Sequence, residues 1–270
     1  MYHLDSIEEG TGRDNLPRDL TAYRQSERER TRMRDLLGLI PTAGITALDV
    51  GARDGHLSKL LAERYETVVA VDLTRLAIDD PRVAPVQGDV CSLAFASDTF
   101  DLVACCEVLE HIPPQLLRQA CAEIARVARG SVVIGVPYRQ DIRLGRTTCR
   151  TCGGRNPPWG HVNSFDEERL CELFRALTLL EVTYVGATKD KTNAAAAALM
   201  DFAGNPYGTY EQEEGCIHCG ARLAGPIHRT LPQKLATKGA LAFNRVQRVV
   251  TPSRGNWIHM RFEKPNRHSA

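Results

Sequence analysis

The sequence predicts an α/β protein with a doubly wound, mostly parallel sheet, and two features of the chain lead to this prediction. Residues 47–72 read as an apolar strand, a turn with two glycines, a helix that begins near His56, and a second apolar strand. Strand and helix patterns then continue to alternate as far as Val136. Parallel strands need a crossover between them, so this order favours a parallel sheet with helices on both faces.

Periodicity and capping residues predict the remaining elements. Ser164 or Asp166 is expected to cap one of the later helices. The predicted helices cover residues 17–38, 117–127, 165–177, 192–200 and 233–249, and the predicted later strands cover residues 83–86, 100–106, 132–136, 180–185 and 257–262.

The turn after the first strand has the features of a nucleoside site. Gly51 and Gly55 let backbone approach a ligand, the following helix offers free N–H groups, and Asp72 at the end of the second strand can accept ribose hydroxyls. The spacing of the glycines differs from the G-x-G-x-x-G of dinucleotide sites. Asp49 would repel a pyrophosphate but suits a ligand that carries an ammonium group. These features disfavour a nicotinamide oxidoreductase.

The pattern D-x-G-x-x-x-G at 49–55 resembles motif I of the class I S-adenosylmethionine-dependent methyltransferases. Arg53 departs from that motif, because a third glycine usually stands there. Two later segments resemble the family's third and fourth motifs: Asp89 after the third strand, and "FDLV…EVLEH" at 100–111. The resemblance covers about residues 44–140, continues more weakly to the end, and is closest to the branch acting on small molecules and saccharide or lipid intermediates.

This resemblance implies a seven-stranded Rossmann-like sheet whose last strand, 257–262, is antiparallel. It also implies S-adenosylmethionine as cofactor, with Asp72 on the ribose and Asp89 near the adenine amino group. A helix at 17–38 would lie over the cofactor, with Tyr23 or Arg24 in reach; the alternative is a solvated helix with Glu/Arg pairs along 28–34. The cofactor-binding residues implied are Asp49, Gly51, Ala52, Arg53, Gly55, Asp72, Leu73, Asp89, Val90, Cys106 and Glu107.

Composition limits the functional classes. The 270 residues carry a formal net charge of +1, so no global basic field attracts nucleic acid. The first residues have neither the basic nor the apolar region of a signal peptide, and no apolar run approaches the roughly 20 residues that span a bilayer. We therefore expect a cytoplasmic protein, in which the nine cysteines are thiols or metal ligands.

Two C-x-x-C-G segments form the second chemical signal. Cys149 and Cys152 are followed, after 63 residues, by Cys216 and Cys219. Two such pairs supply the four thiolates of a structural zinc site. Iron in the same site, a substituted ligand (His161 or His218), and free or redox-active thiols are the alternatives.

The two cysteine pairs also predict a domain organisation. We expect an N-terminal helical cap at 1–43 and a methyltransferase domain at 44–270. The insertions at 139–164 and 187–232 leave the ligand-binding edge of the sheet, so a zinc ion joining them would build a cap over the acceptor.

Methyl transfer to oxygen, or to a protonated amine, also needs a base. His111 and His161 are the candidates, each with a structural alternative: a solvent-facing helix start for His111 and a loop hydrogen bond for His161. Tyr138 and Glu107 are weaker candidates. The sequence thus predicts transfer to an O or N atom of a small-molecule, saccharide or lipid-intermediate acceptor.

Two other functions remain open at this point. One is an RNA methyltransferase whose zinc module recognises nucleic acid, which the basic C-terminal half supports and the neutral net charge opposes. The other is a non-catalytic module that only binds S-adenosylmethionine.

Overall fold

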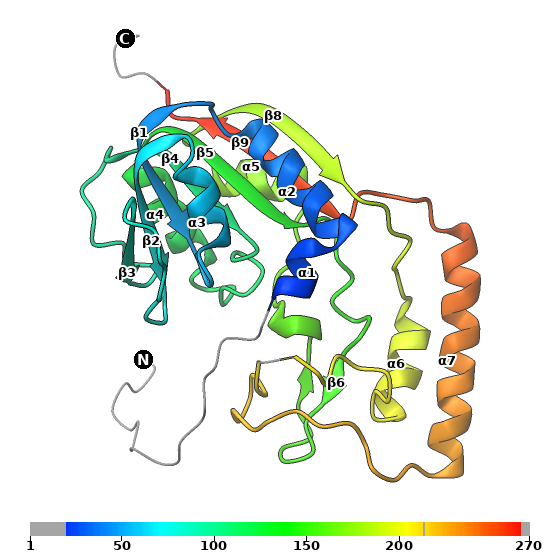
Figure 1. The fold of residues 1–270 in the computed structure, drawn as a ribbon. Coiled ribbons are helices and arrows are strands. Elements are labelled where there is room, and N and C mark those ends of the chain that lie inside the picture. Colours follow the sequence, from blue (N-terminus) through cyan, green and yellow to red (C-terminus); the bar gives the residue numbers. More distant parts are fainter. Residues whose placement is uncertain (1–19, 213, 266–270) are drawn as a thin grey trace, which may run out of the picture.

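A computed structural model describes residues 20–212 and 214–265 of the chain. Its centre is a seven-stranded sheet with the order β3-β2-β1-β4-β5-β9-β8 (Figure 1). Pairing is parallel from β3 to β5, whereas β9 runs antiparallel to both β5 and β8. This confirms the predicted fold class. The strands are β1 (Gly44–Val50), β2 (Tyr65–Asp72), β3 (Val83–Gln87), β4 (Phe100–Cys106), β5 (Ala128–Pro137), β8 (Thr178–Val185) and β9 (Trp257–Glu263).

Side chains alternate between two apolar cores, one on each face of the sheet, because successive residues of a strand point to opposite sides. Along β4, Leu102 and Ala104 enter one core while Val103 and Cys105 enter the other. Helices α2 (Glu27–Leu39) and α3 (His56–Leu61) pack on the first face, and α4 (Leu117–Val127) and α5 (Glu167–Leu173) pack on the second.

Two predicted helices differ from the structure. The helix expected at 165–177 ends at Leu173, because the chain turns at Phe174 to begin β8 four residues later. The helix expected at 17–38 is broken at Ser26, whose extended backbone and side chain cap α2 and separate it from α1 (Thr21–Gln25). Residues 17–19 of that helix, and residues 1–19 of the predicted N-terminal cap, lie outside the described residues.

A second layer of structure lies beside the carboxyl edge of the sheet. It contains the short hairpin of β6 (Thr147–Thr148) and β7 (Arg155–Asn156), the 3-10 turn η1 (Pro158–Gly160), and helices α6 (Ala194–Phe202) and α7 (Leu231–Val250) (Figure 1). Helices α6 and α7 lie side by side. Within the described residues, no helix has the length and apolar character needed to cross a bilayer.

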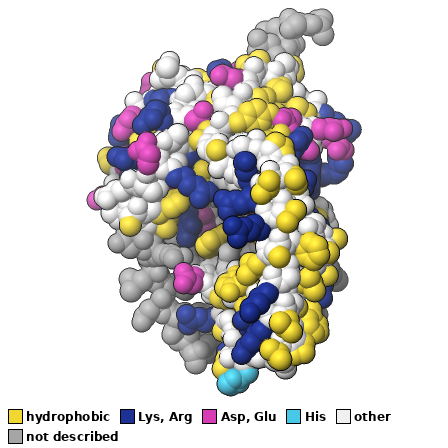
Figure 2. Space-filling model, turned by 90° about the vertical axis from the view of Figure 1, so that its right-hand side faces the viewer, with side chains coloured by type: hydrophobic (Ala, Val, Ile, Leu, Met, Phe, Trp, Pro, Cys, Tyr) yellow, Lys and Arg dark blue, Asp and Glu magenta, His cyan; other side chains and the backbone are white. Residues whose placement is uncertain are grey.

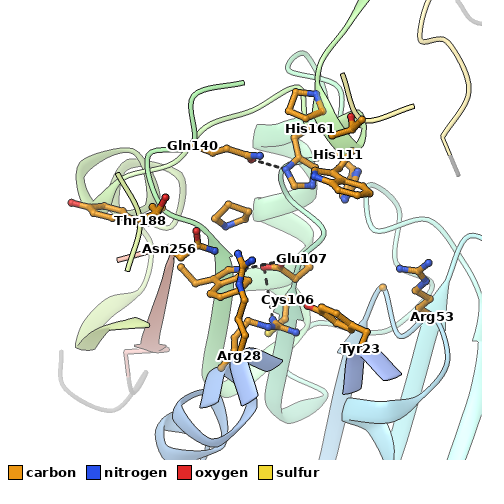
Figure 3. A pocket seen from close by; sticks show the side chains of 18 of the residues that line it. Tyr23, Arg28, Arg53, Cys106, Glu107, His111, Gln140, His161, Thr188 and Asn256 are labelled. Carbon is orange, nitrogen blue, oxygen red and sulfur yellow. Dashed lines mark hydrogen bonds and ion pairs between the residues drawn. The ribbon is translucent and has the colours of Figure 1, made fainter. Parts of the chain in front are cut away.

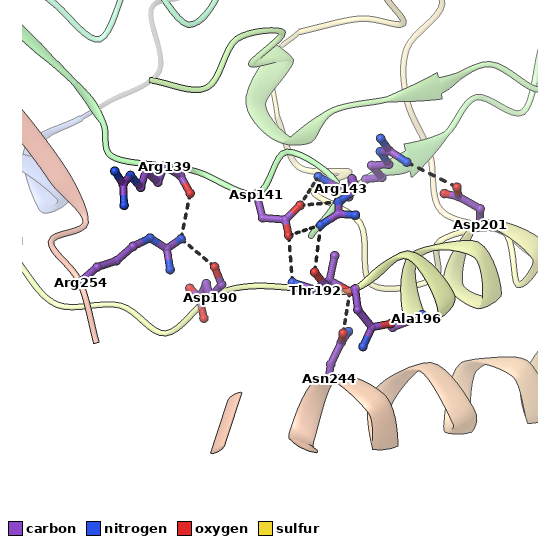
Figure 4. A network of polar contacts seen from close by, with 11 residues as sticks. Arg139, Asp141, Arg143, Asp190, Thr192, Ala196, Asp201, Asn244 and Arg254 are labelled. Atoms are coloured by element: carbon purple, nitrogen blue, oxygen red, sulfur yellow. Dashed lines mark hydrogen bonds and ion pairs between the residues drawn. The ribbon is translucent and has the colours of Figure 1, made fainter. Parts of the chain in front are cut away.

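Polar contacts connect the segments of this layer (Figure 4). Asp141 accepts from the backbone N–H of Thr192 at 2.9 Å, and the Thr192 hydroxyl donates to Asn244 of α7 at 2.6 Å. Arg254 donates to the backbone oxygens of Arg139 and Asp190, at 3.0 and 2.8 Å. The segments following β5, β8 and α7 are therefore held to one another.

Candidate functional site

A cavity of about 850 Å³ lies beyond the carboxyl ends of β1, β4 and β5. The cavity is lined by the loops after β1 and β4, by helices α1 and α2, and by the layer that follows β5 and β8. The carboxyl edge of a parallel sheet is where α/β proteins bind ligands. Among the predicted site residues, its lining includes Asp49, Gly51, Ala52, Arg53, Cys106, Glu107, His111 and His161.

The loop after β1 is anchored to β2 through its backbone. The N–H groups of Gly51 and Ala52 both donate to the Val71 carbonyl, at 2.7 and 3.1 Å. Gly51 has φ +74°, and a Cβ atom placed there would lie 2.2 Å from a methyl carbon of Val108. Only glycine fits this position without displacing its neighbour.

Arg53 stands where the motif usually has a third glycine. Its backbone nevertheless adopts the left-handed conformation, with φ 49°. Its N–H donates to the Asp72 carboxylate at 3.0 Å. Gly55, with φ +71°, then stands at the start of α3. The turn predicted from the sequence is therefore formed, with an arginine in place of the third glycine.

Asp49 is a buried acid beneath this loop. Its carboxylate accepts a hydrogen bond from the Ser58 hydroxyl at 2.6 Å. Burial is the larger influence and raises the pKa of Asp49 to about 6. The group is therefore mostly ionised at neutral pH and offers negative charge on the cavity wall.

The remaining predicted cofactor residues lie at the same edge of the sheet but do not line the cavity. Asp72 accepts from the N–H and hydroxyl of Thr74, each at 3.0 Å, besides its bond from Arg53. Asp89 accepts from the N–H of Cys91 at 2.8 Å. Leu73 is exposed and Val90 is buried.

Glu107 begins the loop after β4, next to the half-buried Cys106. Its carboxylate accepts from the Trp257 indole N–H at 3.1 Å and lies 3.8 Å from the Arg32 guanidinium. Burial raises the pKa of Glu107 and of the Cys106 thiol. Arg28 stacks over the Trp257 ring at 4.5 Å.

Helices α1 and α2 contribute a buried ion network. Glu29 accepts from Arg24 at 2.7 Å and from Arg32 at 2.8 Å, and Arg24 also reaches Asp54 in the loop after β1 at 2.9 Å. Glu29 and Arg32 are only 1% and 4% exposed, so the solvated helix considered at 28–34 is wrong for these two residues. Sequence periodicity missed them because it assigns charged residues to solvent.

His111 and His161 meet at one end of the cavity, away from Arg28 and Tyr23 (Figure 3). Their rings stand edge to face, with centroids 4.6 Å apart and an angle of 89°. His161 is buried and its pKa is lowered to about 3, whereas His111 is exposed, and desolvation by the atoms around its ring lowers its pKa to about 4. Both rings are therefore neutral at pH 7 and, by themselves, weak bases.

Glu110 is a residue of this group that sequence reasoning missed. It is fully buried, and its carboxylate lies within 4.8 Å of a ring nitrogen of each histidine. The E-x-x-E-H spacing from Glu107 to His111 is the signal that points to it.

The four predicted metal-binding cysteines converge. The sulfurs of Cys149 and Cys219 are 3.7 Å apart, and those of Cys152 and Cys216 are 3.6 Å apart. Four sulfurs held about 2.3 Å from a shared zinc ion lie about 3.8 Å from one another. Hydrogen bonds from backbone N–H groups, chiefly that of Cys152, lower the pKa of the Cys149 thiol to about 6.

Comparison with known proteins agrees with the geometry of the central region. A family model described as "Methyltransferase domain" matches residues 48–134. The matched region contains the loop after β1 and the whole of β2, β3 and β4.

Curated relatives match about a third of the chain. The chain is 32% identical to a ubiquinone biosynthesis O-methyltransferase of Paracidovorax citrulli, over 33% of this chain and 42% of the relative. It is 33% identical to the enzyme of that name from Xylella fastidiosa, over 32% of this chain and 40% of the relative. The similarity thus spans less than half the length of these relatives.

Solved structures extend the likeness of fold to most of the chain. The N-methyltransferase NodS of Bradyrhizobium japonicum, in complex with S-adenosyl-L-homocysteine, matches with a TM-score of 0.53 at 15% identity, covering 93% of this chain and 94% of its own. The [4+2]-cyclase SpnF matches with a TM-score of 0.50 at 16% identity, covering 87% and 80%. Since these neighbours differ in named activity, they support the fold alone.

Proposed function

We propose that the protein is an S-adenosylmethionine-dependent methyltransferase that moves a methyl group to an O or N atom of a small-molecule, saccharide or lipid-intermediate acceptor. One observation carries the proposal. The cavity that contains the Gly51 loop of the methyltransferase domain is also walled by the segments after β5 and β8, which leaves room for an acceptor beside the cofactor.

The cofactor's parts fit the polar groups of this edge. The ammonium group would pair with Asp49, and the ribose hydroxyls would bond to Asp72. The adenine would lie toward Asp89 and Val90, and Leu73 would cover its ring. Cys106 and Glu107 would border the sulfonium end, which a negative or neutral wall favours over a cationic one.

The reaction would be an in-line displacement. The acceptor's lone pair attacks the methyl carbon, the carbon–sulfur bond breaks, and its electron pair stays on sulfur. Because the sulfonium is already activated, the protein mainly positions the partners and excludes water, which can contribute roughly 7–11 kcal/mol. His111 and His161 face the acceptor side and are the groups we propose to handle its proton.

The insertions at 139–164 and 187–232 would form the acceptor cap, with residues 1–43 as an N-terminal cap on the domain at 44–270. Gln140, Pro158 and Trp159 of the first insertion and Thr188 and Thr209 of the second line the cavity. We propose zinc for the four cysteines, whose spacing suits it. Four thiolates leave no open position, so this zinc would be structural.

Incubation of the protein with methyl-labelled S-adenosylmethionine and fractions of cell metabolites tests the proposal. Label should move into a small-molecule, saccharide or lipid fraction, and a Gly51→Val variant, whose side chain would fill the loop, should show no transfer. Binding of the cofactor without transfer to any fraction would contradict an enzymatic role and favour a binding module.

An RNA substrate is the second candidate, because one surface favours it. Helix α7 carries four exposed basic residues and no acidic residue, and Figure 2 shows basic side chains among apolar ones on this face. These residues are Lys234, Lys238, Arg245 and Arg248. RNA binding that weakens steeply with salt, together with label in the RNA fraction, would support it over the first proposal.

A further inference from the structure

We propose that Glu110, His111 and His161 bind a divalent transition-metal ion at the acceptor end of the cavity, and that this ion holds an oxygen atom of the acceptor. The metal site is separate from the four cysteines. The binding of the ion is argued from geometry alone, whereas the role of the ion in holding the acceptor rests on the proposed methyl transfer.

The strongest evidence is the state of Glu110. Its side chain is fully buried, and among the described residues neither carboxylate oxygen has a hydrogen-bond partner outside its own residue. The other buried acids differ: Glu29 has two arginines and Asp49 has the Ser58 hydroxyl. A buried polar group without a partner costs free energy, so a fold retains one where a ligand completes it.

The two histidines present nitrogen atoms to the same point. One nitrogen from each ring and one Glu110 oxygen all lie within 4.8 Å of one another. Ligand atoms about 2.1 Å from a shared ion lie roughly 3.0 to 4.2 Å apart, so a small rotation of the side chains brings the three to bonding distance.

Gln140 prepares His161 for this role. Its amide oxygen lies 2.6 Å from Nδ1 of His161, so Nδ1 carries the proton and Nε2 keeps its lone pair (Figure 3). A metal-bound histidine commonly donates its second ring N–H to an oxygen in this way. Gln140 is thus a positioning residue.

The donor set selects the class of ion. Two imidazoles and one carboxylate suit Mn²⁺, Fe²⁺, Co²⁺ or Zn²⁺, whereas Mg²⁺ and Ca²⁺ prefer oxygen ligands. Three protein ligands leave coordination positions open. Both histidines line the cavity, so an acceptor oxygen can reach those positions.

Such an ion would activate an acceptor hydroxyl directly. A hydroxyl bound to a divalent ion loses its proton near neutral pH, and the proton leaves to water through the cavity mouth. The metal-bound oxygen then attacks the methyl carbon, the carbon–sulfur bond breaks, and the products are the methyl ether and S-adenosylhomocysteine. The inference therefore favours oxygen over nitrogen as the methylated atom.

Titration with Mn²⁺, followed by the loss of the free-ion electron paramagnetic resonance signal, tests the site without any turnover. The wild-type protein should bind one Mn²⁺, and Glu110→Gln should bind at least about 10-fold more weakly. Asp190→Asn changes another cavity-lining acid and should bind Mn²⁺ like the wild type. Circular dichroism confirms that each variant is folded.

Equal affinity in the wild type and Glu110→Gln, or no binding by the wild type, would overturn the site. A methyl-transfer assay then tests whether the ion acts on the acceptor. Methylation should rise with added Mn²⁺, and its midpoint should match that of the binding titration. Glu110→Gln should lose methyl transfer while its affinity for S-adenosylhomocysteine is unchanged. Transfer independent of Mn²⁺ would overturn the metal's role. Mn²⁺ binding with no transfer to any acceptor would instead overturn the proposed function and leave the site intact.

Discussion

Asp49 illustrates how a single residue's surroundings set its chemistry. The residue is 2% exposed, and burial outweighs the Ser58 hydrogen bond and raises the pKa of its carboxyl to about 6. A raised pKa means that the carboxyl gains a proton at a higher pH than an exposed aspartate does. The attraction between the ionised carboxylate and an ammonium group is therefore present above pH 6 and declines as the pH falls through 6.

We predict that S-adenosylhomocysteine, which carries the same ammonium group, binds more weakly at pH 5 than at pH 7.5. Asp49→Asn should weaken binding by about 10- to 100-fold at pH 7.5, the range expected for a hydrogen bond to a charged group, and should remove most of the pH dependence. Isothermal titration calorimetry measures both effects. Asp80→Asn, an acid paired with Arg82 on the surface, should match the wild type; an unchanged Asp49→Asn would contradict the assigned partner.

At the scale of elements, α2 determines how the cavity is closed. Its Glu29 and Arg32 are buried, and through Arg24 they connect α1 to Asp54 in the loop after β1. The apolar positions predicted one helix at 17–38, and the structure forms α2 there but separates it from α1 at Ser26. The sequence did not predict which charged side chains turn inward, because that depends on the sheet edge against which the helix packs.

Removing one partner of this buried pair should be costly, since the other charge stays buried and unpaired. Glu29→Ala should lower the free energy of unfolding by about 3–5 kcal/mol. Glu27→Ala on the same helix removes an exposed ion pair with Arg30 and should change it by less than about 1 kcal/mol. Urea denaturation compares the two variants, and similar losses from both would show that burial does not govern the pair.

On the scale of the whole molecule, the cysteine cluster connects segments that are distant in sequence. Cys149 and Cys152 lie in the turn between β6 and β7, and Cys216 and Cys219 come after α6. Side chains near the cluster reinforce this link: Asn156 accepts from the N–H of Ile217 at 2.8 Å. A metal at this point would order two insertions at once, since it closes a long loop.

We predict that the purified protein contains one zinc per chain, and that Cys149→Ser loses it. Hydrogen exchange should then accelerate in both insertions, 139–164 and 187–232, while the sheet keeps its protection. Cys171→Ser, a change at a half-buried cysteine away from the cluster, should keep the metal and the wild-type exchange pattern. Retained zinc, or faster exchange in one insertion alone, would contradict a shared site.

The sequence by itself determined the order of strands and helices, the glycine turn at 51–55 and the two cysteine pairs. These depend on local properties: apolar periodicity, the positive φ that glycine tolerates, and short spacing between ligands. The structure showed Arg53 in that turn and the four sulfurs within reach of one another, both of which extend those local patterns.

Only the tertiary structure decided which distant side chains meet. Glu110 and His161 are 51 positions apart, and their local sequences do not show that the His161 ring comes to lie beside Glu110 and His111. The same holds for Trp257 at the end of the chain, which reaches Glu107 and Arg28. The physical reason is that a parallel sheet brings the ends of its strands to one edge, and the burial and charge of a group there are set by all the loops that converge on it.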